Sequence, residues 1–145
     1  MGVQTEDDVE VAWCADVGYV DFRSLTKDEK LYTVLHHLRS LLKTVHGNVV
    51  HACKGRSGII IRGWYFTTEQ MDLCINTCLH IVKSECEKAD KPFNYCEKTC
   101  EKFVVSRART VLIENYNKIV YTLAQHGFEF KARLGESIFQ IEINP

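Results

Sequence analysis

The beginning of the chain has apolar side chains at every second position. In residues 9–13, Val9, Val11 and Trp13 alternate with Glu10 and Ala12, and Val20 and Phe22 are again two positions apart. Alternation with a period of two predicts a strand that buries one of its sides. We therefore expect two short strands, joined by a turn near Ala15-Asp16.

The pattern then changes to a helical period. From residue 31 to residue 45, apolar side chains recur every three or four positions. Thr26 and Glu29 have the spacing of a capping box, and Gly47 stands where a glycine commonly ends a helix. These features predict a helix from about residue 27 to residue 46.

The middle of the chain contains a hairpin pattern followed by a second helical pattern. Residues 49–53 and 59–66 are rich in β-branched and aromatic side chains and flank a Gly-Arg-Ser-Gly loop. This arrangement predicts a β-hairpin. Thr67 and Gln70 form a second capping box, which begins a predicted helix through Ala89.

The last third predicts more helix and then a final hairpin. Residues 93–126 are helical in pattern, as one long helix or as two segments, and residues 128–134 and 138–143 resume strand patterns around a glycine-containing turn. The predicted order is ββ-α-ββ-α-α-ββ. We therefore expect an α+β fold in which antiparallel β-hairpins pack with about three helices.

Composition adds the expectation of one soluble domain. The chain has 145 residues, of which 46% are hydrophobic and 26% charged, values that are ordinary for a globular protein. We treat residues 1–145 as a single domain, with residues 1–8 as a flexible acidic leader. No apolar run approaches the roughly 20 residues that cross a bilayer, so we predict no membrane partner.

The cysteines change the picture of the environment. The sequence contains seven of them, and no secretory signal precedes them. An odd number of cysteines in such a chain is typical of free thiols in a reducing compartment. We therefore expect reduced cysteines in an intracellular protein of the cytoplasm or nucleus.

Two alternatives use the cysteines differently. Residues 74–78 and 96–100 are two CX3C units, and in these units the chain resembles the twin-CX3C chaperones of the mitochondrial intermembrane space. That resemblance implies disulfides between paired helices. Alternatively, His51 and Cys53 could meet the second unit as zinc ligands, although the CX2C spacing of structural zinc sites is missing. Free cysteines remain our expectation, and we predict no metal and no cofactor.

Charge is distributed unevenly along the chain. Residues 1–29 hold eight acids and two bases, whereas residues 30–68 hold six bases and no acid, although the net charge of the whole chain is −1. The middle segment is therefore strongly basic. Such asymmetry favours an anionic partner more than the total charge suggests.

We expect the basic segment to form one surface on the first helix and the central hairpin. On the helix, two histidines and two cations follow one another at spacings of three or four, which places them on one face. On the second strand of the hairpin, alternation places Arg62 and Trp64 on the same side, and the loop adds two cations. The candidate binding residues are Arg39, Lys43, His46, Lys54, Arg56, Arg62 and Trp64.

These residues predict a function in binding. Cations beside aromatic side chains suit single-stranded nucleic acid, because the charges neutralise phosphates and the rings stack on bases. The stretch IIIRGWYFTTEQMDLC, residues 59–74, also resembles a strand-then-helix segment of single-stranded-DNA-binding transcriptional coactivators. Our leading hypothesis is a non-catalytic intracellular protein that engages RNA or single-stranded DNA through residues 30–68.

The alternative hypothesis is a protein-interaction module. Trp64, Tyr65 and Phe66 would anchor an acidic protein partner or a second copy in a homodimer, since aromatic and arginine side chains also mark interface hot spots. The sequence contains no GXSXG elbow, Walker loop, GXGXXG fingerprint or HEXXH motif. We therefore expect no enzymatic activity.

Overall fold

The protein, seen in a computed structural model that describes residues 11–56, 58–65 and 68–144, is built on a five-stranded antiparallel sheet. Its elements are β1 (Val11–Asp16), the 3-10 turn η1 (Phe22–Ser24), α1 (Glu29–Leu41), β2 (Asn48–Gly55), β3 (Ile59–Tyr65), α2 (Thr68–Lys88), α3 (Phe93–Gln125), β4 (Phe130–Leu134) and β5 (Ile138–Ile143). The strands are ordered β1-β2-β3-β5-β4, so β3 is central. The α+β class and the alternation of helices with hairpins are confirmed.

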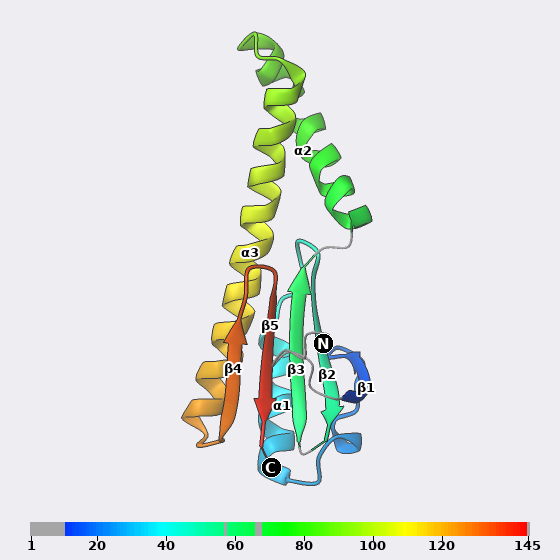
Figure 1. Cartoon of the computed structure of the whole chain (residues 1–145), viewed down its shortest axis with the longest axis vertical. Helices are drawn as coiled ribbons and strands as arrows, with labels where there is room; N and C mark the ends of the chain where they lie inside the picture. The colour runs from blue at the N-terminus through cyan, green and yellow to red at the C-terminus, as the bar shows by residue number, and fades with distance from the viewer. Residues whose placement is uncertain (1–10, 57, 66–67, 145) are drawn as a thin grey trace, which may run out of the picture.

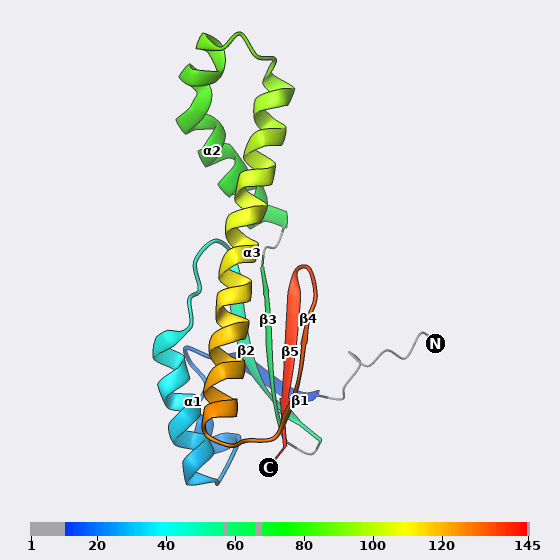
Figure 2. The same cartoon turned by 90° about the vertical axis from the view of Figure 1, so that its left-hand side faces the viewer.

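The molecule has two regions of different construction. α1 and the second half of α3 lie against one face of the sheet, while α2 and the first half of α3 project beyond its end as a helical hairpin (Figures 1 and 2). We call residues 68–107 the arm and the remaining described residues the body. Over the described ranges, no helix has the length and apolarity of a bilayer-spanning segment.

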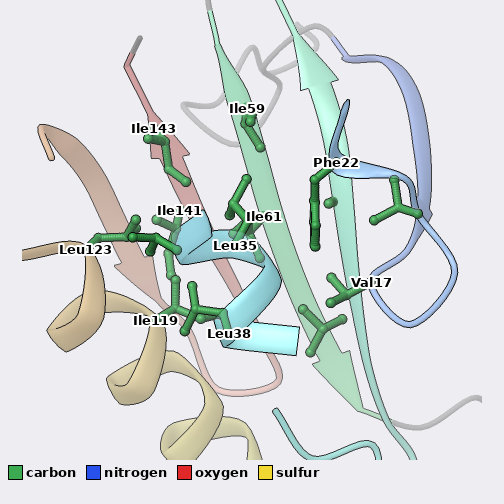
Figure 3. Packing of buried hydrophobic residues seen from close by; sticks show 14 of the residues in the cluster. Val17, Phe22, Leu35, Leu38, Ile59, Ile61, Ile119, Leu123, Ile141 and Ile143 are labelled. Carbon is green, nitrogen blue, oxygen red and sulfur yellow. The ribbon is translucent and has the colours of Figure 1, made fainter. Parts of the chain in front are cut away.

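The main core lies between the sheet and its two helices. The strands contribute alternate apolar residues to this face, and α1 and α3 cover them with leucine and isoleucine side chains, as Figure 3 shows. The labelled core residues are Val17, Phe22, Leu35, Leu38, Ile59, Ile61, Ile119, Leu123, Ile141 and Ile143. All of these residues belong to the body.

A glycine lets an aromatic ring lie flat on the central strand. Gly63 pairs with Phe139 across β3 and β5, and a Cβ atom at position 63 would overlap the Phe139 ring. The ring is 1% exposed and meets Tyr116 of α3 edge-on, at 5.8 Å between centroids. Gly63 is thus required by close packing rather than by a turn.

A buried asparagine explains why α1 is shorter than predicted. The helix ends at Leu41, not near residue 46, and the next turn of chain is held by Asn115 of α3. The Lys43 N–H donates to Asn115 Oδ1 at 2.9 Å, and Asn115 Nδ2 donates to the Lys43 carbonyl at 2.7 Å. These bonds satisfy backbone groups that a longer helix would have paired internally.

The N-terminal segment holds one strand where alternation predicts two. β1 is present, but Val20 and Phe22 are buried in the following turn and in η1. The turn closes on Asp16, whose carbonyl accepts from the N–H groups of Tyr19 and Val20, each at 2.9 Å. Apolar residues spaced two apart can therefore be buried by a turn as well as by a strand.

An exposed ion pair joins η1 to the start of α1. Arg23 Nη1 lies 2.5 Å from Glu29 Oε1, and the guanidinium stands 3.7 Å from the centroid of the Tyr32 ring. The hydrogen bond from Arg23 lowers the pKa of Glu29 below its ordinary value, and the same bond raises the pKa of Arg23. The N-cap of α1 is Asp28, which accepts from the Leu31 N–H at 3.1 Å; Thr26 instead accepts from the Asp28 N–H at 3.1 Å.

Candidate functional site

The predicted binding residues of the first helix lie on the helix-covered side of the sheet. Arg39 is half-buried, its Nε donates to the Val17 carbonyl at 3.0 Å, and its guanidinium also donates to the Val20 carbonyl. The same guanidinium stands 4.6 Å from the centroid of the Phe22 ring. Arg39 therefore fastens the β1–η1 turn to α1.

The two candidates that follow α1 are also distant from the central strand's other face. Lys43 Nζ forms an ion pair with Glu114 of α3 at 3.1 Å. His46 is exposed in a turn with positive φ and lies at the base of the arm, beside Leu73 and Arg107. The first helix and its end thus do not continue the surface that carries Arg62 and Trp64.

Two of the four hairpin candidates lie on the opposite face of the sheet. Arg62 and Trp64 project from β3 to the side away from α1 and α3, as alternation predicts, because Ile61 and Gly63, which alternate with them, face the core. We call the side that carries Arg62 and Trp64 the helix-free face, since no helix of the described chain covers it (Figure 2). Lys54, near the end of β2, is opposite the core residue Ile59 and therefore belongs to the helix-covered side, and Arg56 lies in the β2–β3 turn; both are exposed.

Pairing across the strands adds residues that the sequence analysis did not select. Arg62 is opposite His51 on β2 and opposite Gln140 on β5, and Gln140 is in turn opposite Arg133 on β4. Arg62 Nε donates to Gln140 Oε1 at 2.9 Å. The result is a polar row, His51-Arg62-Gln140-Arg133, which crosses four neighbouring strands.

A small cavity lies at one end of this polar row. It has a volume of about 320 Å³, and its lining includes Arg62, Arg133, Gln140 and Ile138. The two arginines come from strands that are both hydrogen-bonded to β5, so they stand on either side of the nearly buried Gln140 amide. Two guanidinium groups around one cavity form a suitable site for an anion.

An aromatic residue completes the site. Trp64 is two residues beyond Arg62, is half-buried, and meets the His51 ring edge-on at 4.7 Å between centroids. Its partner across the strands is Ile138, which is half exposed. Cation, amide and aromatic groups therefore occur together on the central part of the helix-free face.

The rest of the helix-free face is mixed in character. Lys131 of β4 is exposed and stands opposite Glu142 of β5, so one cation is balanced by one acid. Nearer the β2–β3 turn, Cys53 and Ile60 are buried. The concentration of positive charge is consequently centred on Arg62 and Arg133, not spread over the whole face.

The cysteines form disulfides, which overturns two predictions. Cys14 pairs with Cys53 between β1 and β2, Cys78 with Cys100 between α2 and α3, and Cys86 with Cys96 farther along the arm. The prediction of reduced cysteines is wrong, and so is the placement in the cytoplasm or nucleus, because such bonds are typical of oxidising compartments. Cys74, the one cysteine outside these three pairs, is a free thiol.

The disulfides also decide the two alternatives for these cysteines. The CX3C units do meet on paired helices, as the resemblance implies, but Cys78 pairs with Cys100, and Cys96 pairs with Cys86, outside both units. A zinc site with Cys53, Cys96 and Cys100 does not form, because all three sulfurs are bonded. Within the described residues, no group of three or more His, Cys, Asp or Glu is placed to hold a metal.

The arm exposes large apolar side chains. Its own core is small, with Ile75, Cys100 and Val104 buried between the helices. Leu73, Ile81, Tyr95 and Phe103 are 68%, 71%, 54% and 55% exposed. They line two cavities of about 630 and 320 Å³ that share Cys78, Ile81 and Phe103. The sequence analysis did not select these residues, although their positions on helices of weak amphipathicity could have indicated them.

Comparison with known proteins adds no functional information. No protein-family model matches the chain, and no curated protein or solved structure matches it either.

Proposed function

We propose that this chain is a non-catalytic binding protein that holds single-stranded nucleic acid on the helix-free face of its sheet. The observation that carries the proposal is the placement of Arg62 and Arg133 around one cavity, with Trp64 on the same face. Arg62 and Trp64 were predicted from the sequence, and Arg133, Gln140 and His51 join them through strand pairing.

The two arginines supply the charge that a phosphodiester chain needs. Arg62 and Arg133 project from strands that flank β5, so their backbones are roughly 10 Å apart, twice the spacing of neighbouring strands. Planar guanidinium groups bind phosphate oxygens through two parallel hydrogen bonds. Gln140, which already accepts from Arg62 Nε, fixes the orientation of one of these groups.

Trp64 supplies the second half of the recognition. Single-stranded binders place aromatic side chains beside cations on a sheet, so that a base stacks while its phosphate is neutralised. Trp64 lies on the central strand, two positions from Arg62, and its indole is held edge-on by His51. A flat ring held in this way has few rotamers to lose when a base stacks on it.

The form of the site also favours a polymer over a small ligand. The polar row His51-Arg62-Gln140-Arg133 crosses four strands, and the cavity at Arg62 and Arg133 lies at one end of it. A chain of phosphates can contact several such groups in succession, whereas a small anion would use one. Stacking and backbone charge carry little base sequence information, so sequence-specific readout is not part of the proposal.

The proposal is tested by fluorescence anisotropy with a labelled oligo(dT) of about 16 nucleotides, the upper site size of single-strand binding folds. We expect binding that weakens steeply between about 50 and 200 mM salt. Arg62→Gln and Arg133→Gln should each weaken it several-fold and reduce its salt dependence. Trp64→Leu should weaken it by roughly fivefold or more, the equivalent of one lost stacking contact.

Two charge-matched variants serve as controls. Lys43→Gln removes a cation on the helix-covered side, and Lys102→Gln removes an exposed cation of the arm; both should bind like the unchanged protein. Absence of binding at about 50 mM salt would refute the proposal. An effect of Lys43→Gln as large as that of Arg62→Gln would also refute it, because recognition would then not be confined to the helix-free face. So would binding of heparin with the same affinity as oligo(dT) and with no change on Trp64→Leu, because charge alone would then explain the binding.

A further inference from the structure

The arm carries an apolar groove that the body does not use. The cavity beside Leu73 and the cavity beside Tyr95 are neighbours that share Cys78, Ile81 and Phe103 in their linings. This groove therefore follows the seam between α2 and α3 along one side of the arm. Exposed apolar surface of this extent on a soluble protein marks an interaction site.

We propose that the groove binds the same groove of a second copy of this chain, so that two arms form a four-helix bundle. This inference is independent of the proposed nucleic-acid function, because it uses a different region and different residues. A two-helix hairpin presents half of the core of such a bundle, and a second hairpin covers it with helices packed side by side. In a dimer with two-fold symmetry, the same groove of each copy contacts the other, so the interface is self-complementary.

The exposed area suits a dimer. Fully exposed aromatic and large apolar side chains each present about 150–250 Å², so the four residues, all more than half exposed, supply on the order of 400 Å². A stable interface buries about 800 Å² from each partner, so these four side chains supply about half of it. The exposed Thr77, Ala89 and Thr99 line the same two cavities and add to the contact area.

The charges of the arm favour a second arm over a strongly charged partner. Residues 68–107 contain seven acids and six bases, so each arm has a net charge of only −1 and the repulsion between two arms is weak. Arg107 borders the groove near the body, and Glu85 borders it toward the tip. In an antiparallel pair of arms, the Arg107 end of one groove meets the Glu85 end of the other, which favours this orientation over the parallel one.

The test measures the oligomeric state of the oxidised full chain by sedimentation equilibrium. We expect a reversible dimer, and Ile81→Glu or Phe103→Glu should raise its dissociation constant at least about tenfold, because each places a charge in the centre of the interface. Both side chains are exposed in the monomer, so the variants should retain the helical circular dichroism of the unchanged protein.

Phe93→Glu is the matched control. Phe93 is 68% exposed on the same arm but lines a different cavity, beside Leu79 and His80. It should leave the dimer intact. A chain that stays monomeric at about 100 μM, a concentration at which interfaces of this size normally associate, overturns the inference. An equal loss of dimer with Phe93→Glu overturns it as well.

A charge exchange tests the orientation separately. Arg107→Glu should weaken the dimer, and the double variant Arg107→Glu/Glu85→Arg should restore it, because the pair is re-formed across the two-fold axis. Restoration supports the antiparallel arrangement. A double variant that is weaker than either single variant contradicts it.

Discussion

The body and the arm contain similar helices but hold them in place by different means. In the body, α1 and α3 cover a sheet whose inward side chains form one continuous core, with Phe139, Leu35 and Leu38 almost fully buried. In the arm, only Ile75, Cys100 and Val104 are buried in the corresponding cluster. Two disulfides join α2 to α3 in the arm, whereas the body has one, between β1 and β2.

This difference indicates where each region obtains its stability. A hairpin of two helices has no third layer, so it cannot bury enough apolar surface to offset the entropy of ordering its residues. Cross-links reduce that entropy difference by restricting the unfolded chain. The arm can therefore expose apolar side chains for a partner and remain folded, while the body depends on packing.

The largest expected effect is the loss of a ring from the body. Phe139→Ala should lower the free energy of unfolding by about 3–5 kcal/mol, since it leaves a cavity above Gly63 and beside Tyr116. Urea denaturation followed by circular dichroism measures this change. Phe103→Ala is the matched variant in the arm, and it should change the stability by less than about 0.5 kcal/mol because Phe103 is exposed.

Equal costs for these two phenylalanines would contradict the comparison. Such a result would mean that the Phe103 ring is buried in solution, as it would be in the proposed dimer. Repeating the measurement at low protein concentration separates the two cases, because only a contribution from association depends on concentration.

The next largest expected effect is the loss of local stability in the arm when a disulfide is removed. The paired variant Cys78→Ala/Cys100→Ala should reduce the opening free energy of α2 amides by about 3 kcal/mol. The amides of β3 and β5 should keep their protection from hydrogen exchange, because the body core is untouched. Native-state hydrogen exchange resolves the two regions in one experiment.

Removing the Cys14–Cys53 disulfide between β1 and β2 should have the converse effect, on the body and not on the arm. Cys14→Ala/Cys53→Ala should destabilise the body by a similar amount, through its β1–β2 pairing, and should leave the arm amides unchanged. If α2 stays fully protected without Cys78–Cys100, the small apolar cluster of the arm is sufficient, and the contrast between the regions fails.

Local patterns in the sequence predict most of the elements of the body. Helical period, glycine turns and strand alternation indicate α1, the two later hairpins and the helical character of α3, which the pattern left open as one helix or two, because each depends on residues close in the chain. The end of α1 was missed, since Asn115 holds Lys43 from 72 positions away. Alternation also placed Val20 and Phe22 in a strand, although a turn buries them.

The functional residues show the same division between local and distant information. Alternation predicts that Arg62 and Trp64 share a side, but the contact of Arg62 with Gln140 joins residues 78 positions apart. The prediction of reduced cysteines was wrong for a related reason. The odd number of cysteines says nothing about which sulfurs meet, and the packing of α2 against α3 decides that Cys78 reaches Cys100.

The smallest expected effect is on the pH dependence of the unfolding free energy, and we expect it in the body alone. Because Arg23 lowers the pKa of Glu29 in the folded chain, the stability contributed by this pair is present above the ordinary carboxylate pKa and is lost as pH falls through the lower, folded value. Glu29→Gln should therefore flatten the pH dependence of the unfolding free energy of the body below about pH 4.5, by a small amount because both groups are exposed.

Urea titrations of the unchanged protein and of Glu29→Gln between about pH 3 and pH 6 measure this difference. Hydrogen exchange of α2 amides should not distinguish the two proteins, because the pair lies at the η1–α1 corner, far from the arm. A pH dependence that is the same in both proteins would mean that the ion pair does not persist in solution. A change that also reached α2 would instead show that the body and the arm unfold together, and the independence of the two regions would have to be abandoned.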